Sequence, residues 1–490
     1  MEQINIISIE FVGFVFVTLA FYYILPWLTG KWGALTEAIR FISPNGLQNI
    51  ILLAASYYFY RSWSPFFIYI LALITVINFG FGFWIEKSVA HKKAILRFGI
   101  FLNLIVLAWY MLGGPLLLDL EFVPLDFKFK VFSFLVFPVG ISYYVLNGIS
   151  YMVDISLRIA KPTTNFVDFA LYLAYFPKLI SGPLERARKF LPMLAEKRTV
   201  DNAQIASSLT LILVGLLRAA ILAGIFSLLL PGKPLESPAQ SNALSLIWAI
   251  ITVMFFIYNS FAGYTDIVRG VSGLYGIPLT RNFMHPFFSK DFSDFWQRWH
   301  ISLSQWLRDY IYMPVSRAFL RRNPSRTNIP NLILPPLVTM LVSGLWHGAT
   351  PNLLLWGFLM GLFIVIENVR ALYRPAVPQQ SVPLWRRILG FASMLVLMMI
   401  AVAPFNLELS DTILFYRQLI FGWGPAAINL LPGIVIPISL LIDWLQSRSN
   451  DEVVFLKWPV WTQVILIVSI TMGTIIIQQL QSAPAVFTYP

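Results

Sequence analysis

The chain has 490 residues, of which 58% are hydrophobic and only 12% are charged, and its formal net charge is +12. Soluble domains carry about 25% charged residues, so this chain lacks the polar surface that a water-soluble protein of its length needs. The composition therefore excludes a soluble globular protein and indicates an all-α polytopic membrane protein. Because the basic residues gather between apolar runs, the positive charge indicates cytoplasmic loops and no nucleic-acid partner.

Apolar runs of roughly 20 residues are the expected membrane-spanning helices, with the lipid bilayer as their partner. The first run has no basic n-region and no small-residue cleavage site, so it is interpreted as a span and not as a signal peptide. Two early runs are expected to form a tight hairpin around Arg61–Pro65. About 11 spans are predicted, at residues 7–26, 47–62, 65–85, 98–118, 131–153, 205–231, 242–261, 352–369, 386–404, 426–443 and 459–479.

The charges of the first loops predict the orientation, because cytoplasmic loops are enriched in Lys and Arg. The N-terminal segment MEQINI has one acid and no base, and residues 86–97 carry four bases. Residues 119–127 have three acids and no base, and residues 158–161 are basic again. These signs alternate with each span. We therefore expect the N-terminus outside the cell and residues 86–97 in the cytoplasm.

Two regions do not fit simple spans. Residues 166–184 are apolar but interrupted by Pro177 and Pro183, and residues 282–351 combine a charged, tryptophan-rich block with a proline-rich apolar stretch. Broken or short helices at membrane depth are tolerated where they line a cavity within the protein. Both regions are therefore predicted to be re-entrant, interfacial or cavity-lining. No repeat or soluble segment is evident, so residues 1–490 are interpreted as a single membrane domain.

The block FWQRWHISLSQWLRDY, residues 295–310, reads as an amphipathic helix. Ser293 is a suitable N-cap, and an acid at position 294 suits the first turn. Positions at helical spacing form one largely apolar face, at Trp296, His300, Leu303, Leu307 and Tyr310. Such a helix lies along a membrane interface. From the residues alone, His300 either packs in that interface or serves a function.

His347 lies in the stretch SGLWHGAT, within residues 327–366, which contain no Asp, Glu, Lys or Arg. An ionisable group inside a membrane is costly and indicates function. The alternative is a histidine that only bonds to a neighbouring helix. Gly344 and Gly348 leave room for a close approach of backbone or ligand. The near-neutral pKa of histidine suits a base acting on a hydroxyl group or on water.

Several other chemistries are excluded or have no sequence support. The chain has no cysteine, so thiol nucleophiles, disulfides and Cys-ligated metals are excluded. No H-E-x-x-H spacing, P-loop or G-x-S-x-G motif occurs. We therefore predict no metal site and no permanently bound cofactor. Histidine chemistry must use one of the four histidines, at positions 91, 285, 300 and 347.

Two motifs, RWHISLSQWLRDYIYMPV and MLVSGLWHGATPNLLLWG, resemble the membrane-bound O-acyltransferase family. The resemblance is strongest to its bacterial branch, which contains alginate O-acetyltransferase and the D-alanyl transferase of teichoic acids. Three upstream stretches agree with it, at residues 137–154, 175–192 and 261–270. The resemblance covers about 130–365, with peripheral spans at 1–125 and 370–490.

The resemblance implies a ring of transmembrane helices around a central funnel or tunnel, in the bacterial inner membrane. It implies an O-acyltransferase, most simply an O-acetyltransferase, with His347 as the base and His300 as the second catalytic histidine. The donor would be acetyl-CoA or another acyl thioester from the cytoplasm. The acceptor would be a hydroxyl group of an extracytoplasmic polysaccharide, such as an alginate-like polymer, or of a separate exported acetyltransferase partner.

The remaining candidates would bind substrate around these histidines. The arginines would attract an anionic donor, although positive-inside anchoring of the loop explains them equally well. The predicted substrate-binding residues are Arg298, Trp296, Ser302, Ser304, Trp306, Arg308, Asn282 and Trp346. His285, which precedes Pro286 in a predicted loop, is given a mainly structural role. The alternative functions are a multi-pass transporter or channel of a cell-envelope polysaccharide system and a non-catalytic scaffold for polysaccharide export.

Overall fold

The computed structural model describes most of the chain. Its described part is helical, without a strand, which confirms the all-α prediction. The chain divides into two compact units, one comprising Met1–Leu209 and Val268–Thr280, the other Thr210–Ile267 and Arg281–Pro490. The described residues are 5–29, 45–119, 138–229, 235–325, 327–373, 384–425 and 430–482.

Among these residues, 8 helices are long and apolar enough to cross a membrane, and they confirm a multi-pass membrane protein. Most of the predicted spans reappear in this set. The candidate spans are Ile9–Trp27, Pro65–Lys87, Lys92–Leu112, Asn202–Leu229, Ala243–Leu274, Ile329–His347, Pro351–Tyr373 and Val460–Leu480. The count of about 11 spans, the ring arrangement and the single domain stay predictions. Part of the predicted spans 131–153 and 426–443 lies outside the described residues.

The first unit begins with α1 and the expected hairpin of α3 and α4. Helix α3 ends at Arg61, and Ser64 caps α4 by accepting a hydrogen bond from the Phe66 amide at 3.4 Å. As predicted, residues 166–184 form only short helices, because α8 ends at Ala174 and α9 has 4 residues. The helices of this unit are α1 (Ile9–Thr29), α3 (Gly46–Arg61), α4 (Pro65–Lys87), α5 (Lys92–Asp119), α7 (Ile141–Ser156), α8 (Phe166–Ala174), α9 (Phe176–Leu179) and α10 (Ala187–Ala195), together with most of α11 (Asn202–Leu216).

The second unit contains both predicted catalytic histidines. Two π-helical turns interrupt its helices, at Leu217–Leu222 and Arg308–Tyr312, and such turns are frequent at functional sites. Its helices are α12 (Ala223–Leu229), most of α14 (Ala243–Leu274), α15 (Phe292–Arg298), α16 (Ile301–Leu307), α17 (Met313–Arg322), α18 (Ile329–His347), α19 (Pro351–Tyr373), α20 (Leu384–Asn406), α21 (Leu409–Phe421), α22 (Pro432–Ser449) and α23 (Val460–Ser482).

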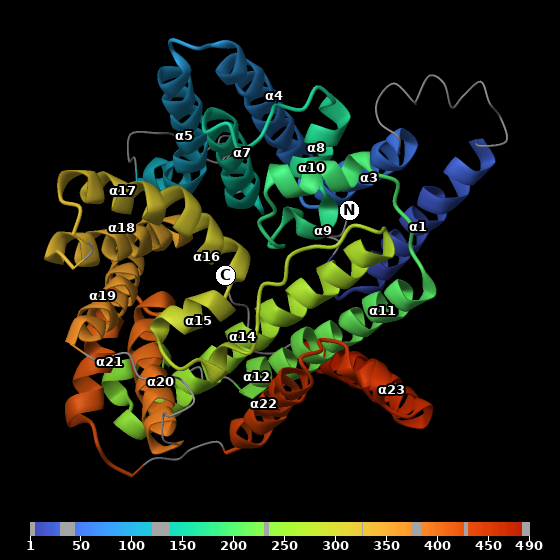
Figure 1. The fold of residues 1–490 in the computed structure, drawn as a ribbon. Helices are drawn as coiled ribbons and strands as arrows, with labels where there is room; N and C mark the ends of the chain where they lie inside the picture. The colour runs from blue at the N-terminus through green and yellow to red at the C-terminus, as the bar shows by residue number, and fades with distance from the viewer. Residues whose placement is uncertain are drawn as a thin grey trace. The chain divides into compact units, whose positions relative to one another are not determined.

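Helices α18 and α19 form a close pair that carries His347 at the end of α18 (Figure 1). Glycines permit the approach, since a Cβ atom at Gly344 would lie 2.4 Å from the Leu353 carbonyl oxygen and one at Gly357 would lie 2.4 Å from that of Met340. For this part of residues 282–351 the expectation of a broken helix is wrong, although α15 and α16 in the same region are short. Helix α18 continues through Pro335 and Pro336 because packing against neighbouring helices can compensate for the lost backbone hydrogen bonds.

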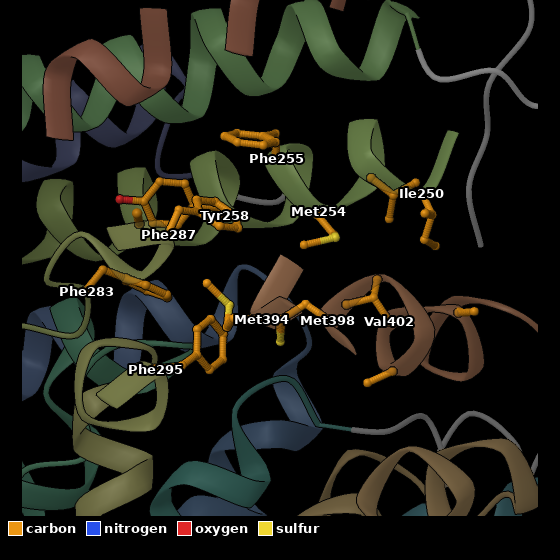
Figure 2. Packing of buried hydrophobic residues seen from close by; sticks show 14 of the residues in the cluster. Ile250, Met254, Phe255, Tyr258, Phe283, Phe287, Phe295, Met394, Met398 and Val402 are labelled. Atoms are coloured by element: carbon orange, nitrogen blue, oxygen red, sulfur yellow. The ribbon is translucent and has the colours of Figure 1, made fainter. Parts of the chain in front are cut away.

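The core of the second unit is an apolar cluster contributed by α14, α15, α18, α19 and α20 and by the loop around Phe287 (Figure 2). The rings of Phe255 and Phe287 stack with centroids 4.5 Å apart. Met394, Met398 and Val402 of α20 lie close to this group. Because the cluster is continuous, it fixes the helices that surround the histidines.

Candidate functional site

The segment around His300 is bent, not a straight helix. Helix α15 begins at Phe292 with Asp291 as its N-cap, whose side chain accepts a hydrogen bond from the Asp294 amide at 2.8 Å. The predicted cap, Ser293, instead donates through its amide and its hydroxyl to the Glu367 carboxylate, each at 3.0 Å. Helix α15 ends at Arg298, and α16 begins at Ile301. The prediction of one continuous helix over residues 295–310 is therefore wrong.

The bend occurs at His300, which has φ 42° and ψ 53° in the left-handed region. This conformation is uncommon for residues other than glycine and turns the chain between the two helices. The bend does not move His300 to the surface, because its exposed fraction is 3%. Its ring packs edge-on against Phe261, with centroids 4.8 Å apart. The ring thus points into the protein, as expected, but a bend in the chain directs it there and not the spacing along one helix.

The His300 imidazole is neutral at physiological pH. Burial lowers the pKa of His300 to about 3, and the nearby His347 lowers the pKa further. Neither ring nitrogen has a hydrogen-bond partner within the described part of the chain. A neutral imidazole carries one donor and one acceptor. Both are therefore available for a bound molecule.

His347 ends α18 and sits among aromatic rings. Its centroid lies 4.7 Å from that of Trp346, 5.2 Å from Trp356 and 4.9 Å from Phe405. Unlike His300, this residue is exposed. The ring of Trp346 also lies 6.3 Å from His300, so one indole contacts both histidines. The predicted candidate Trp346 is therefore placed beside both imidazoles.

Both histidines line a single cavity of about 110 Å³, although 47 residues separate them (347 − 300). The rest of its wall is apolar, which favours exclusion of water during a reaction. The wall comprises Met254, Ile257, Phe261, Phe287, Phe295, Trp296, Trp299, Leu303, Trp356, Met360, Met398, Val402 and Phe405.

A second, more polar cavity of about 480 Å³ shares Trp296 with the histidine cavity. Residues 293–308 contribute much of its wall, including Trp296 and Leu307 of the predicted apolar face. Arg308 and Ser304, both predicted to bind substrate, line it. Its other polar residues are Ser293, Gln297, Gln305, Tyr312, Thr339 and Asn368. Trp296 therefore lines both the apolar cavity and the polar one.

Other predicted residues make contacts within the protein. The Arg298 guanidinium pairs with Asp294 at 2.8 Å, one helical turn away. Trp306 is buried, and its ring lies 5.1 Å from that of Tyr310. The amide of Ser302 donates to the side-chain oxygen of Asn282 at 3.1 Å. Their substrate-binding roles stay predictions, and the contacts support structural roles for them.

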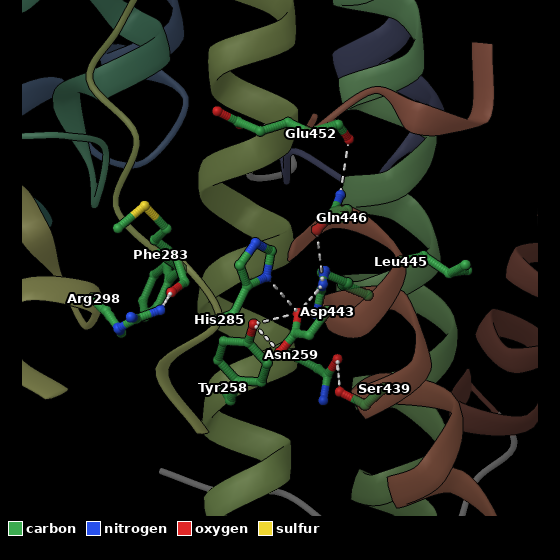
Figure 3. A network of polar contacts seen from close by, with 12 residues as sticks. Tyr258, Asn259, Phe283, His285, Arg298, Ser439, Asp443, Leu445, Gln446 and Glu452 are labelled. Carbon is green, nitrogen blue, oxygen red and sulfur yellow. Dashed lines mark hydrogen bonds and ion pairs between the residues drawn. The ribbon is translucent and has the colours of Figure 1, made fainter. Parts of the chain in front are cut away.

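The sequence analysis missed a buried polar network in the second unit. The Asp443 carboxylate of α22 accepts from Arg218 at 2.5 Å and from the Tyr258 hydroxyl at 2.8 Å (Figure 3). His285 lies 3.6 Å from the same carboxylate. Arg218 and Asp443 both fall inside predicted spans, and a charge inside an apolar run indicates a buried partner. That signal was present in the sequence, but it did not identify which residues pair.

Comparison with known proteins is consistent with this arrangement. The profile of MBOAT, the membrane-bound O-acyltransferase family, matches residues 155–409. A probable alginate O-acetylase AlgI from Azotobacter vinelandii is 31% identical over 79% of this chain and 75% of the relative. A peptidoglycan O-acetyltransferase from Helicobacter pylori is 26% identical over 65% of this chain and 64% of the relative. A teichoic acid D-alanyltransferase from Streptococcus thermophilus is 29% identical over 47% of this chain and 56% of the relative. These matches confirm the predicted family and branch, and the chain belongs to the membrane-bound O-acyltransferase family.

Proposed function

We propose that this membrane O-acyltransferase transfers a short acyl group, most simply acetyl, from a thioester to a hydroxyl group, with His347 as the base. The observation that carries the proposal is the shared cavity, where two imidazoles distant in sequence meet within an apolar wall. Its volume of about 110 Å³ suits a short acyl group better than a long chain. The relatives named as O-acetylases and O-acetyltransferases support acetyl as the group transferred.

The two histidines have different surroundings and different proposed roles. His347 lines the shared cavity, so its ring can reach an acceptor bound there. It takes the hydroxyl proton while the oxygen attacks the thioester carbonyl carbon. The C–S bond then breaks, the ester forms, and the leaving thiolate takes up a proton. General base help of this kind contributes typically about 10²–10⁴ in rate.

His300 is buried and neutral, with both nitrogens available in the described structure. It donates a hydrogen bond to the thioester oxygen as negative charge develops there. A preorganised donor of this kind contributes about 10²–10³ in kcat. The aromatic wall excludes water, so water competes less with the acceptor hydroxyl group for the thioester carbonyl.

The larger polar cavity is the proposed approach for the donor. The exposed Arg308 on its wall can attract a phosphate group of acetyl-CoA or of another acyl thioester. The donor would come from the cytoplasm, with the N-terminus outside and the protein in the bacterial inner membrane. The acceptor would be an extracytoplasmic glycan or a separate exported acetyltransferase. The names of the relatives, which refer to alginate, peptidoglycan and teichoic acid, support an acceptor in the cell envelope.

A histidine substitution tests this proposal. His347→Ala should abolish transfer of label from acetyl-CoA to cell-envelope glycan while the protein still inserts and purifies normally. The matched control is His91→Ala, because His91 is an exposed histidine in a loop of the other unit. Persistent transfer in the His347 variant would contradict the proposal. Loss of solute flux with intact acyl transfer would instead favour a transporter.

A further inference from the structure

Two short segments on either side of α15 pair with each other through their backbones. Residues 281–285 lie against residues 298–302. The Met284 amide donates to the Arg298 carbonyl at 2.9 Å, and the Ile301 amide donates to the Asn282 carbonyl at 2.9 Å. The Asn282 side-chain oxygen accepts from the Ser302 amide at 3.1 Å. His300 therefore lies within a backbone clamp formed by these two segments.

Asn282 supplies the N-terminal cap that α16 does not provide for itself. The N-cap residue of α16 is His300, and its side chain makes no capping hydrogen bond. The first amides of a helix have no partner within the helix. Asn282 accepts from the first two of them, at Ile301 and Ser302, with its backbone and side-chain oxygens. One residue from another segment thus fixes the chain immediately after His300.

This contact bears on the histidine because His300 is in the left-handed region, with φ 42°. Such a conformation persists where the surrounding structure holds it. If the Ser302 amide lost its side-chain acceptor, the turn between α15 and α16 would loosen and the imidazole could move away from the cavity. We propose that Asn282 is a positioning residue that acts through the His300 backbone, and this inference rests on the acyl transfer proposed above.

His285 lies at the other end of the segment that carries Asn282. This residue is also left-handed, with φ 52°, and its exposed fraction is 5%. Its Nδ1 lies 3.6 Å from the Asp443 carboxylate, beyond hydrogen-bonding distance, and that carboxylate is held by Arg218 and Tyr258 (Figure 3). Arg281 at the start of the segment pairs with Glu452 at 3.5 Å. The segment that carries Asn282 is thus fixed on both sides of that residue.

The contacts of Asn282 favour positioning over direct substrate binding. Its exposed fraction is 1%, and both of its oxygen atoms are used by the amides of α16. Its side-chain nitrogen, Nδ2, has no partner in the described structure. The two roles therefore depend on different atoms of the same amide. A substitution that keeps the oxygen and removes the nitrogen separates them.

The test compares Asn282→Asp with Asn282→Leu in protein reconstituted in nanodiscs, with acetyl-CoA as the donor. Aspartate retains the acceptor and is as good an N-cap as asparagine, but it has no Nδ2. Leucine is of similar size and removes both side-chain groups, so the Ser302 amide loses its acceptor while the Ile301 amide keeps its backbone one. We expect Asn282→Asp to keep most of the wild-type kcat. Asn282→Leu should lose about 100-fold in kcat, with little change in KM, because a misplacement near 1 Å has that effect.

A second readout does not depend on activity. Hydrogen exchange in a peptide covering residues 299–304 should accelerate in Asn282→Leu and stay slow in Asn282→Asp. If the wild-type protein uses no thioester, the proposed function fails, and the exchange comparison still tests the clamp. Unchanged exchange in Asn282→Leu overturns the inference. Equal loss of kcat in both variants, with slow exchange retained in Asn282→Asp, also overturns it, since an intact clamp then does not preserve activity.

If Asn282→Leu does not fold, His285 provides a second pair of variants. His285→Asn keeps a polar side chain beside Asp443 and tolerates the left-handed conformation, whereas His285→Ala does neither. We expect the asparagine variant to retain kcat and slow exchange at residues 299–304. The alanine variant should have a lower kcat and faster exchange at residues 299–304. Equal behaviour of the two variants contradicts a role of His285 in holding this segment.

Discussion

Gly344→Ala tests whether the position of His347 depends on the close pairing of α18 and α19. Gly344 lies one turn before His347 and faces Leu353 of α19. An added Cβ would lie 2.4 Å from the Leu353 carbonyl oxygen, whereas ordinary contacts begin at 3.4 Å. The obstacle is backbone, so a side-chain rotation cannot relieve the overlap. The end of α18 must move instead.

The size of that movement follows from the two distances. The overlap is 3.4 − 2.4 = 1.0 Å, so α18 and α19 must separate by a comparable amount near the histidine. Overpacking of this kind destabilises by about 1–3 kcal/mol. A displacement near 1 Å of a catalytic group costs about 100-fold in rate. We therefore expect a large loss of kcat with only a moderate loss of thermal stability.

The assay measures kcat for acetyl transfer and the melting temperature of the purified variant in the same detergent. Gly80→Ala is the matched control, because a Cβ at this helical glycine meets nothing within 4 Å. The control should keep wild-type activity. Full activity and an unchanged melting temperature in Gly344→Ala would refute the reasoning that the glycine contact places His347.

Three further predictions concern the cavity, the buried ion pair and pH. Met398→Ala shortens a side chain in the wall of the histidine cavity and so enlarges the cavity. When butyryl-CoA and acetyl-CoA compete, the ratio of butyryl to acetyl transfer should therefore rise. An unchanged ratio would show that this wall does not limit acyl length. Asp443→Leu leaves the Arg218 guanidinium buried without its carboxylate partner, so the free energy of unfolding measured with denaturant should fall by about 3–5 kcal/mol. A variant as stable as the wild type would contradict the pairing. Because the pKa of His300 is about 3, the imidazole stays neutral as pH falls from about 8 to 5. The acid limb of the kcat profile should therefore coincide in wild type and His300→Asn, and a shifted limb would assign that titration to His300.

The fold class and most long spans follow from the sequence because a membrane places the same demand on every span. Each must present roughly 20 apolar residues and satisfy its backbone internally. The motif around His347 was identified for a related reason, since one ionisable group stands out in a long uncharged stretch. Helix α18 was not predicted as a span, because its prolines lower the local helix propensity. Its packing against α19 is a tertiary effect that the local sequence does not show.

The conformation of His300 could not be predicted from the residues next to it in the sequence. Helical spacing places Trp296, His300 and Leu303 on one face, and all three do line the cavity. They reach it through a bend held by Asn282, whose contacts with residues 301 and 302 span about 20 positions. The walls contributed by Trp356, Met398 and Phe405 also come from distant helices. Their sequence context is apolar, so no local pattern distinguishes them from ordinary core residues.

The most direct measurement is a cryo-electron microscopy structure of the protein with acetonyl-CoA, in which a methylene group separates sulfur from carbonyl. We predict that the ketone oxygen lies between the imidazoles of His300 and His347 and that the pantetheine arm passes Trp296 into the polar cavity. A well-ordered analogue bound elsewhere, with the histidine cavity unoccupied, would contradict the account.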